Sequence, residues 1–122
     1  MDQAEKVRVN RHSKHAGYGG GHVTISQPAD NTQCTAGTTI NANGTYDVSN
    51  NYQVSNVSVT YEDETGTAQK ISGAVTQQPN GTWTTSFTLP KANWKYILCA
   101  RAMKIQPPLT MDNDDHFLTT SS

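Results

Sequence analysis

The sequence has no long hydrophobic run. Its apolar residues never approach the ~20 consecutive positions that a membrane-spanning helix needs, and its first residues lack the apolar stretch of a secretory signal. Hydrophobic residues make up 34% of the 122 residues, and the mean hydropathy is −0.66. We expect no membrane insertion and no leader, hence either a protein that works without export or a part of a longer secreted one.

The sequence also has no excess of either positive or negative charge. Nine Lys and Arg residues nearly balance ten Asp and Glu residues, for a formal net charge of −1. Because binding to nucleic acid needs clustered cations that neutralise phosphates, this balance argues against a nucleic-acid partner. The charges are nevertheless uneven along the chain. Basic residues gather near the start at Lys6, Arg8, Arg11 and Lys14, and acidic ones near the end at Asp112, Asp114 and Asp115.

What the sequence does contain is alternation. In residues 57–61 and 82–89 the large apolar side chains fall on every second position, which is the period of a strand with one buried face. Turn residues separate such stretches, and Asn80-Gly81 is a strong hairpin signal. We predict strands at 22–26, 38–46, 54–62, 68–71, 82–89 and 96–103, with a further one at 115–120 if a last strand exists.

This pattern predicts one small all-β domain, because short strands at regular spacing favour an antiparallel β-sandwich over a closed barrel. Residues 1–21 form an N-terminal arm that contains the run from Gly17 to Gly21. The sandwich occupies 22–104. Residues 105–122 form a tail in which Pro107-Pro108 interrupts any strand.

Several short motifs resemble the bacterial and phage immunoglobulin-like repeats. They cover about residues 22–103, and the resemblance implies an immunoglobulin-like two-sheet sandwich that serves adhesion, spacing or display and has no catalytic residues. The chain departs from the family's pattern after Met103, where a regular last strand is expected. The motifs are Pro28-Ala29-Asp30-Asn31, Ala36-Gly37-Thr38-Thr39-Ile40, Asn43-Gly44-Thr45, Val57-Ser58-Val59-Thr60, Asn80-Gly81-Thr82-Trp83-Thr84, and Leu89-Pro90 followed by Tyr96.

The two cysteines permit one disulfide or two free thiols. Cys34 lies where the immunoglobulin-like family places a core-facing apolar residue, which implies a small buried side chain. Strand parity places Cys99 on the outer face, because Tyr96, Leu98 and Ala100 are expected to face the core. We therefore predict that the two thiols are not bridged.

Candidate catalytic and metal motifs are weak. His12, His15 and His22 could join Cys34 in holding zinc, but no rigid turn or paired-cysteine motif supports such a site. His116 stands beside two aspartates in a polar tail, where surface charge is the simpler explanation. The glycine-rich run lacks the helix and Lys-Ser/Thr of a phosphate loop. We expect no enzyme activity, no metal and no cofactor.

Binding features are stronger. The outward row on strand 96–103 contains three apolar residues beside an arginine, and such a patch is usually covered, by the arm or tail of the same chain or by another subunit. Trp94 lies in a connection, where it packs over the end of the sandwich or anchors an interface. The arm is predicted to be an attachment element, because its ordering requires contacts from a partner. The predicted partner-binding residues are Arg8, Arg11, Lys14, Tyr18, Trp94, Ile97, Arg101 and Met103.

The leading hypothesis is a non-enzymatic structural module that docks onto a larger assembly, most concretely a phage capsid decoration or appendage protein located on the virion. Its partners would be capsid or appendage subunits or further copies of itself. The alternative is an immunoglobulin-like repeat of a secreted cell-surface adhesin, which would bind protein or surface carbohydrate. A small metal- or substrate-dependent enzyme is a remote third option.

Overall fold

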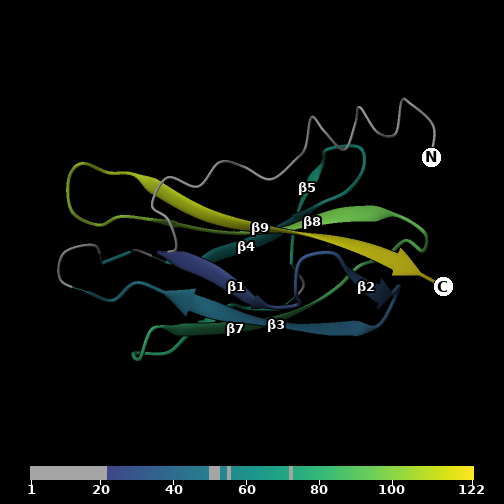
Figure 1. Ribbon diagram of the computed structural model, residues 1–122, viewed down its shortest axis with the longest axis horizontal. Helices are drawn as coiled ribbons and strands as arrows, with labels where there is room; N and C mark the ends of the chain where they lie inside the picture. Colours follow the sequence, from purple (N-terminus) through teal and green to yellow (C-terminus); the bar gives the residue numbers. More distant parts are fainter. Residues whose placement is uncertain (1–21, 50–52, 55, 72) are drawn as a thin grey trace.

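Two β-sheets pack face to face in the computed structural model, which describes residues 22–49, 53–54, 56–71 and 73–122 (Figure 1). Sheet A has the strand order β1-β3-β7-β6 and sheet B the order β2-β9-β8-β4-β5. The predicted all-β sandwich is confirmed. None of the described residues belongs to a helix long and apolar enough to cross a membrane. The strands are β1 (Val23–Gln27), β2 (Thr32–Thr35), β3 (Thr39–Tyr46), β4 (Ser58–Glu62), β5 (Ala68–Lys70), β6 (Thr76–Gln77), β7 (Thr82–Thr88), β8 (Lys95–Met103) and β9 (Met111–Ser121).

The core lies between the central strands of the two sheets. On β7 every second residue is buried, including Trp83 and Phe87, and Leu89 continues the same face just beyond the strand. From sheet B, β8 contributes Tyr96 and Leu98 to the same cluster. The alternation in the sequence thus places one face of each central strand in the core, which is where most of the hydrophobic stabilisation arises.

Trp83 is accommodated by a close approach between β1 and β3. Its indole Nε1–H donates to the backbone oxygen of Thr24 at 2.9 Å. A Cβ atom at Gly44, which pairs with Trp83 across the sheet, would lie 1.8 Å from that oxygen and 2.7 Å from the indole ring. Only a glycine therefore leaves room for the indole to reach its acceptor.

The most important difference from the predicted strands is β2. This strand pairs with β9 in parallel, with Thr32 opposite Leu118 and Thr35 opposite Ser121. The pairing crosses more than 80 residues of sequence, and no local turn signal announces it. β9 also begins at Met111, ahead of the predicted start at 115, because its first half pairs with β8 despite its polar side chains.

The acidic stretch in β9 is not surface charge, and that expectation was wrong. Asp112 and Asp115 are buried. Asp112 accepts the backbone N–H of Val23 at 2.8 Å, and Asp114 accepts that of Ile25 at 2.8 Å. The carboxylates thus occupy the hydrogen-bonding edge of β1 and join sheet A to sheet B along one side of the sandwich.

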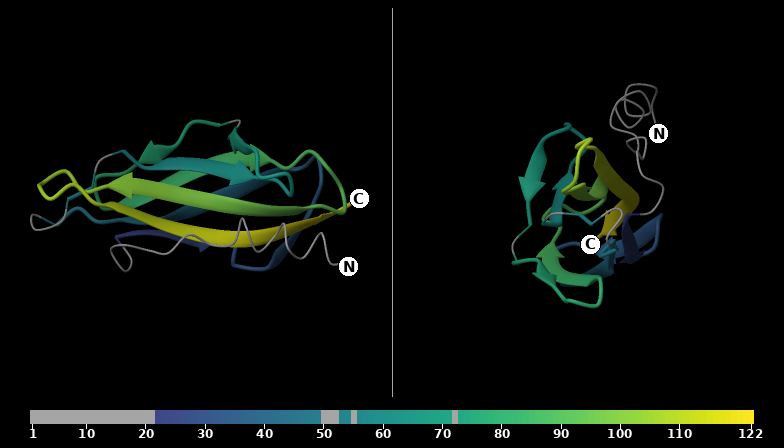
Figure 2. Two further views of the ribbon diagram at one scale, coloured as in Figure 1. Left: turned by 90° about the horizontal axis from the view of Figure 1, so that it is seen from above. Right: turned by 90° about the vertical axis from the view of Figure 1, so that its left-hand side faces the viewer.

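The strands run along the length of the molecule, so its turns gather at two ends (Figure 2). The turn between β8 and β9 lies at the left-hand end in Figure 1, and the C-terminus lies at the right-hand end. The predicted Asn80-Gly81 turn is confirmed between β6 and β7, where Gly81 has a φ of 91°. Its carbonyl accepts the backbone N–H of Tyr46. A rigid sandwich therefore presents loops and turns at each end.

Candidate functional site

The exposed apolar side chains of the described residues concentrate at the turn between β8 and β9. Met103 and Met111 face each other as the last residue pair of the two strands, and Ile105 and Leu109 follow within the turn. Their exposures are 38%, 38%, 50% and 63%, respectively. We call these four residues the hairpin surface. A group of exposed apolar side chains on a projecting turn is typical of a binding element rather than of a solvated loop.

The turn is held in place by backbone hydrogen bonds. The N–H of Lys104 donates to Thr110 across the hairpin at 2.8 Å, and the N–H of Ile105 donates to Gln53 at 2.8 Å. A bridge between Val54 and Lys104 continues this contact. The hairpin surface is thus fixed to the neighbouring loop between β3 and β4, and its side chains project from an anchored backbone.

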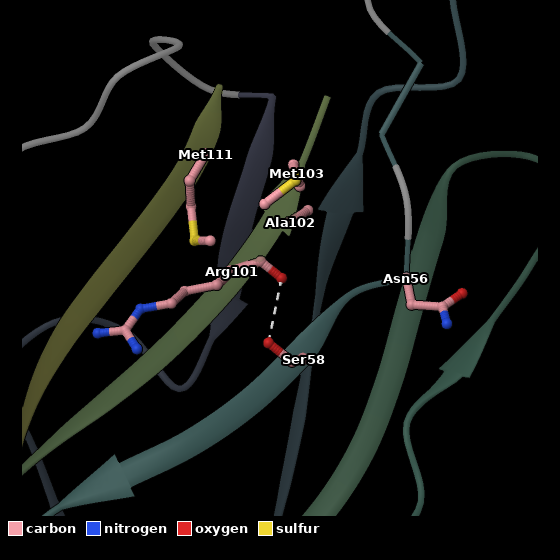
Figure 3. A pocket seen from close by; sticks show the side chains of 6 residues that line it. All are labelled: Asn56, Ser58, Arg101, Ala102, Met103 and Met111. Carbon is pink, nitrogen blue, oxygen red and sulfur yellow. Dashed lines mark hydrogen bonds between the residues drawn. The ribbon is translucent and has the colours of Figure 1, made fainter. Parts of the chain in front are cut away.

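A hollow of about 350 Å³ lies beside the hairpin surface on the outer face of sheet B. Figure 3 shows Met103, Met111 and Arg101 on adjacent strands around it, with Asn56 on the other side. The Ser58 hydroxyl donates to the backbone oxygen of Arg101 at 3.5 Å, so this contact is weak. The complete lining is Asn56, Ser58, Arg101, Ala102, Met103 and Met111.

The chemistry of this hollow suits the binding of another macromolecule. Methionine side chains are flexible and polarisable, so they adapt to apolar surfaces of different shapes. Arg101 carries a planar group of donors that suits carboxylates and carbonyls. Residues 103–111 contain Lys104 but no acidic residue. The site therefore offers an apolar surface with positive charge beside it.

The structure brings together two of the predicted partner-binding residues, Arg101 and Met103. Ile97 points outward as expected, but it is buried. Trp94 lies at the opposite end of β8, where it packs against the core cluster with the Lys91 ammonium 4.1 Å from its ring centre. The predicted arm residues, Arg8, Arg11, Lys14 and Tyr18, lie outside the described residues, as do His12 and His15.

The residues that complete the site are not indicated by the local sequence pattern. The sequence pattern places Ile105, Leu109 and Met111 in a tail interrupted by Pro107-Pro108. The useful signal is the spacing between Met103 and Met111, because two strands that meet around a proline-containing turn place such residues side by side. Asn56 and Ser58 join the hollow only because β4 lies next to β8, which no local pattern indicates.

The histidine and carboxylate contacts of the described residues are structural. His116 donates from Nδ1 to the Pro28 carbonyl at 2.8 Å, and its Nε2 lies 3.5 Å from Asp114. His22 lies 2.7 Å from Asp47 through Nδ1. Within 22–49, 53–54, 56–71 and 73–122, no three His, Cys, Asp or Glu residues are arranged to hold a metal ion.

Both cysteines are free thiols in separate parts of sheet B. Cys34 lies on β2 and is half-buried, and burial raises the pKa of its thiol. Cys99 lies at the centre of β8 and is fully buried. Burial, and next the hydrogen bond with Asp115, raise the pKa of the Cys99 thiol far above its ordinary value. Neither thiol is therefore activated as a nucleophile.

Comparison with known proteins shows a structural similarity in the fold but identifies no function. No protein-family model matches the sequence, and the comparison with curated proteins also finds no match. Among solved structures, the chain is similar to a DUF4785 family protein from Legionella pneumophila, with a TM-score of 0.57 and 14% sequence identity. The similarity covers 75% of this chain and 27% of that protein, so the chain spans about a quarter of its length. The chain is thus a β-sandwich domain that is structurally similar to part of a larger bacterial protein.

Proposed function

We propose that this chain is a non-enzymatic, immunoglobulin-like binding module that docks onto a larger protein assembly, most concretely a phage virion that it decorates. One observation carries the proposal: the hairpin surface exposes four apolar side chains, and two of them, Met103 and Met111, line a hollow together with Arg101. A solvated turn gains nothing from such side chains, whereas a partner that buries them gains hydrophobic stabilisation.

The size of the surface indicates the kind of binding. Burying one large apolar side chain contributes about 1.5–3 kcal/mol, and the hairpin surface is already partly buried. Because these four residues are about half exposed, burying the rest of them contributes roughly 3–6 kcal/mol, which is at the low end of the 4–15 kcal/mol that the loss of translational and rotational freedom is estimated to cost. Attachment through this surface alone is therefore weak, and many copies on a repetitive assembly would hold together better than one copy on one partner.

The test uses phage particles produced from the genome that carries this gene, after the gene has been deleted. Purified chain is added back, and the bound fraction is measured by co-sedimentation. The wild-type chain should bind. The double variant Ile105→Asp/Leu109→Asp should lose at least tenfold in affinity, because it places two charges in the contact. The control is Thr84→Asp, which adds a charge at an exposed position on sheet A and should bind like the wild type.

Two outcomes would overturn the proposal. The first is that the wild-type chain does not bind the particles; retention on immobilised polysaccharide would then favour the adhesin alternative. The second is that the hairpin variant binds as well as the wild type, which would remove this surface from the contact.

A further inference from the structure

The tripeptide Asn-Gly-Thr occurs twice in the sequence, and the structure places its two copies in different environments. Asn43-Gly44-Thr45 lies within β3, whereas Asn80-Gly81 forms the turn before β7 and Thr82 begins that strand. Because glycine has no side chain, its backbone nitrogen is sterically free to approach the side-chain carbonyl of a preceding asparagine. The chain thus holds one potentially reactive sequence in two structural settings.

At the turn, the side chain of Asn80 is held by Thr82. Asn80 Oδ1 accepts the backbone N–H of Thr82 at 3.2 Å and the hydroxyl of the same residue at 2.8 Å. Two donors on one carbonyl oxygen stabilise the negative charge that this oxygen acquires when a nucleophile adds to Cγ. Asn80 is also exposed, so water reaches its amide. The turn therefore prepares this side chain for nucleophilic attack.

The nucleophile would be the backbone nitrogen of Gly81, which is the next residue. Gly81 has a φ of 91°, and its N–H donates to the Gln78 carbonyl at 3.0 Å. This single turn hydrogen bond has to open before the nitrogen can add to Cγ of Asn80. Because both reacting groups belong to neighbouring residues, the reaction is intramolecular and loses little translational freedom.

The copy in β3 lacks this freedom. Gly44 is buried, and its strand pairs with β1 on one side and with β7 on the other. The Thr45 hydroxyl bonds to the hydroxyl of Thr24 at 2.6 Å, so it is engaged across the sheet. Turning the Gly44 nitrogen toward Asn43 would break backbone pairing in the middle of sheet A, which leaves buried polar groups without partners.

We propose that Asn80 is a modification site at which the folded chain deamidates without an enzyme. The Gly81 nitrogen forms a bond to Cγ of Asn80 and releases its proton to water. The Cγ–Nδ2 bond breaks, and Nδ2 takes up a proton and leaves as ammonia. Water then opens the cyclic imide at either of its carbonyls, which gives aspartate or isoaspartate. The reaction consumes only water and is independent of the proposed docking.

The products would change one end of sheet A. Both add a negative charge, and isoaspartate also lengthens the main chain of the turn by one carbon. Tyr46 is fastened to this turn, because its N–H donates to the Gly81 carbonyl at 2.8 Å and its hydroxyl donates to the Gln78 carbonyl. The turn lies at the same end of the sandwich as the turn between β8 and β9 (Figure 1). Ageing of the protein would therefore alter the end that carries the hairpin surface.

The test compares the two Asn-Gly bonds within one molecule. The full chain is incubated at neutral pH, and peptide mapping by mass spectrometry measures conversion to aspartate and isoaspartate at each position. In the folded protein Asn80 should react at least tenfold faster than Asn43. In concentrated urea the two rates should agree within twofold, because the tripeptides are identical. Equal rates at the two positions in the folded protein would overturn the proposal.

A second comparison tests the contribution of Thr82. Thr82→Val removes the hydroxyl donor to Asn80 and should slow the reaction at Asn80 at least threefold in the folded protein. Thr82→Ser keeps the hydroxyl and should react like the wild type. Circular dichroism checks that both variants fold, and the rates in urea correct for the change of sequence. A Thr82→Val variant that deamidates as fast as Thr82→Ser would overturn the activation of Asn80 by this turn.

Discussion

Asp112 holds the edge of β1 from the opposite sheet. It is 1% exposed and accepts the N–H of Val23, which is itself buried. Replacing it with alanine leaves a buried N–H without its carboxylate partner, so Asp112→Ala should lower the free energy of unfolding by about 1–3 kcal/mol. Urea unfolding measures this loss. Thr84→Ala, at an exposed position, is the control, and an equal effect of the two substitutions would contradict the structural role of Asp112.

The Asp47 carboxyl, which follows β3 and contacts His22 next to the start of β1, makes the free energy of unfolding depend on pH. Hydrogen bonds from the side chain and then the backbone of Ser49, with a further contribution from His22, hold the pKa of the Asp47 carboxyl below its ordinary value of 3.8. A carboxyl with a depressed folded-state pKa stabilises the fold above its unfolded-state pKa. That contribution is lost as the pH falls through the folded-state pKa.

Asp47→Asn should therefore lower the Tm at neutral pH, and the difference from the wild type should shrink as the pH falls below about 4. Thermal unfolding followed by circular dichroism between pH 2 and 7 measures this. The single-site difference is obtained by comparing the two proteins at each pH, since other carboxyls titrate in both. A difference that grows toward low pH would have the wrong sign for this mechanism.

At the scale of elements, the contact between β1, β3 and β7 depends on the absence of a side chain at Gly44. A Cβ atom at Gly44 would collide with Thr24 and with the Trp83 ring. Gly44→Ala should force the indole to lose its acceptor and should cost about 3 kcal/mol or more, as expected for overpacking in a core. Gly37→Ala is the matched control, because a Cβ there meets nothing within 4 Å and only its φ of 80° is unfavourable.

Urea unfolding of the two alanine variants separates collision from backbone strain. Near-ultraviolet circular dichroism should also change in Gly44→Ala, since Trp83 is the ring that moves. If Gly37→Ala destabilises the protein as much as Gly44→Ala, the close approach at Trp83 is not the dominant effect.

The elements differ in how well the sequence predicts them. β7 and β8 have one apolar face, so their alternation predicts both the strand and the side that is buried. β2 has the polar sequence Thr-Gln-Cys-Thr and exists because β9 lies beside it, so its strand structure depends on a contact across the whole domain. Arg101 and Met103 could be placed on the outer face from the alternation of side chains along β8. Met111 could be placed beside Met103 only by treating Pro107-Pro108 as part of a hairpin turn, and the polar first half of β9 gives no strand pattern that supports this.

For the whole molecule, the last strand is the element on which both sheets depend. β9 pairs with β8 and β2 within sheet B, and its carboxylates bind β1 of sheet A. Leu118 on this strand is fully buried. Deletion of residues 117–122 removes the partner of β2 and part of the core, so this chain should not fold cooperatively at 25 °C. Near-ultraviolet circular dichroism and urea unfolding test this, and a cooperative transition like that of the full chain would contradict it.

The parallel pairing of β2 with β9 also has a consequence for the order in which the protein can be made. A ribosome produces β2 more than 70 residues before β9, and the amide groups of Val23 and Ile25 on β1 also find their acceptors only on β9. Until residues 111–121 have been synthesised, the growing chain carries unpaired strand edges and an open core. Closure of this sandwich therefore has to follow the synthesis of β9, and any factor that protects nascent strands would act on these residues before β9 emerges.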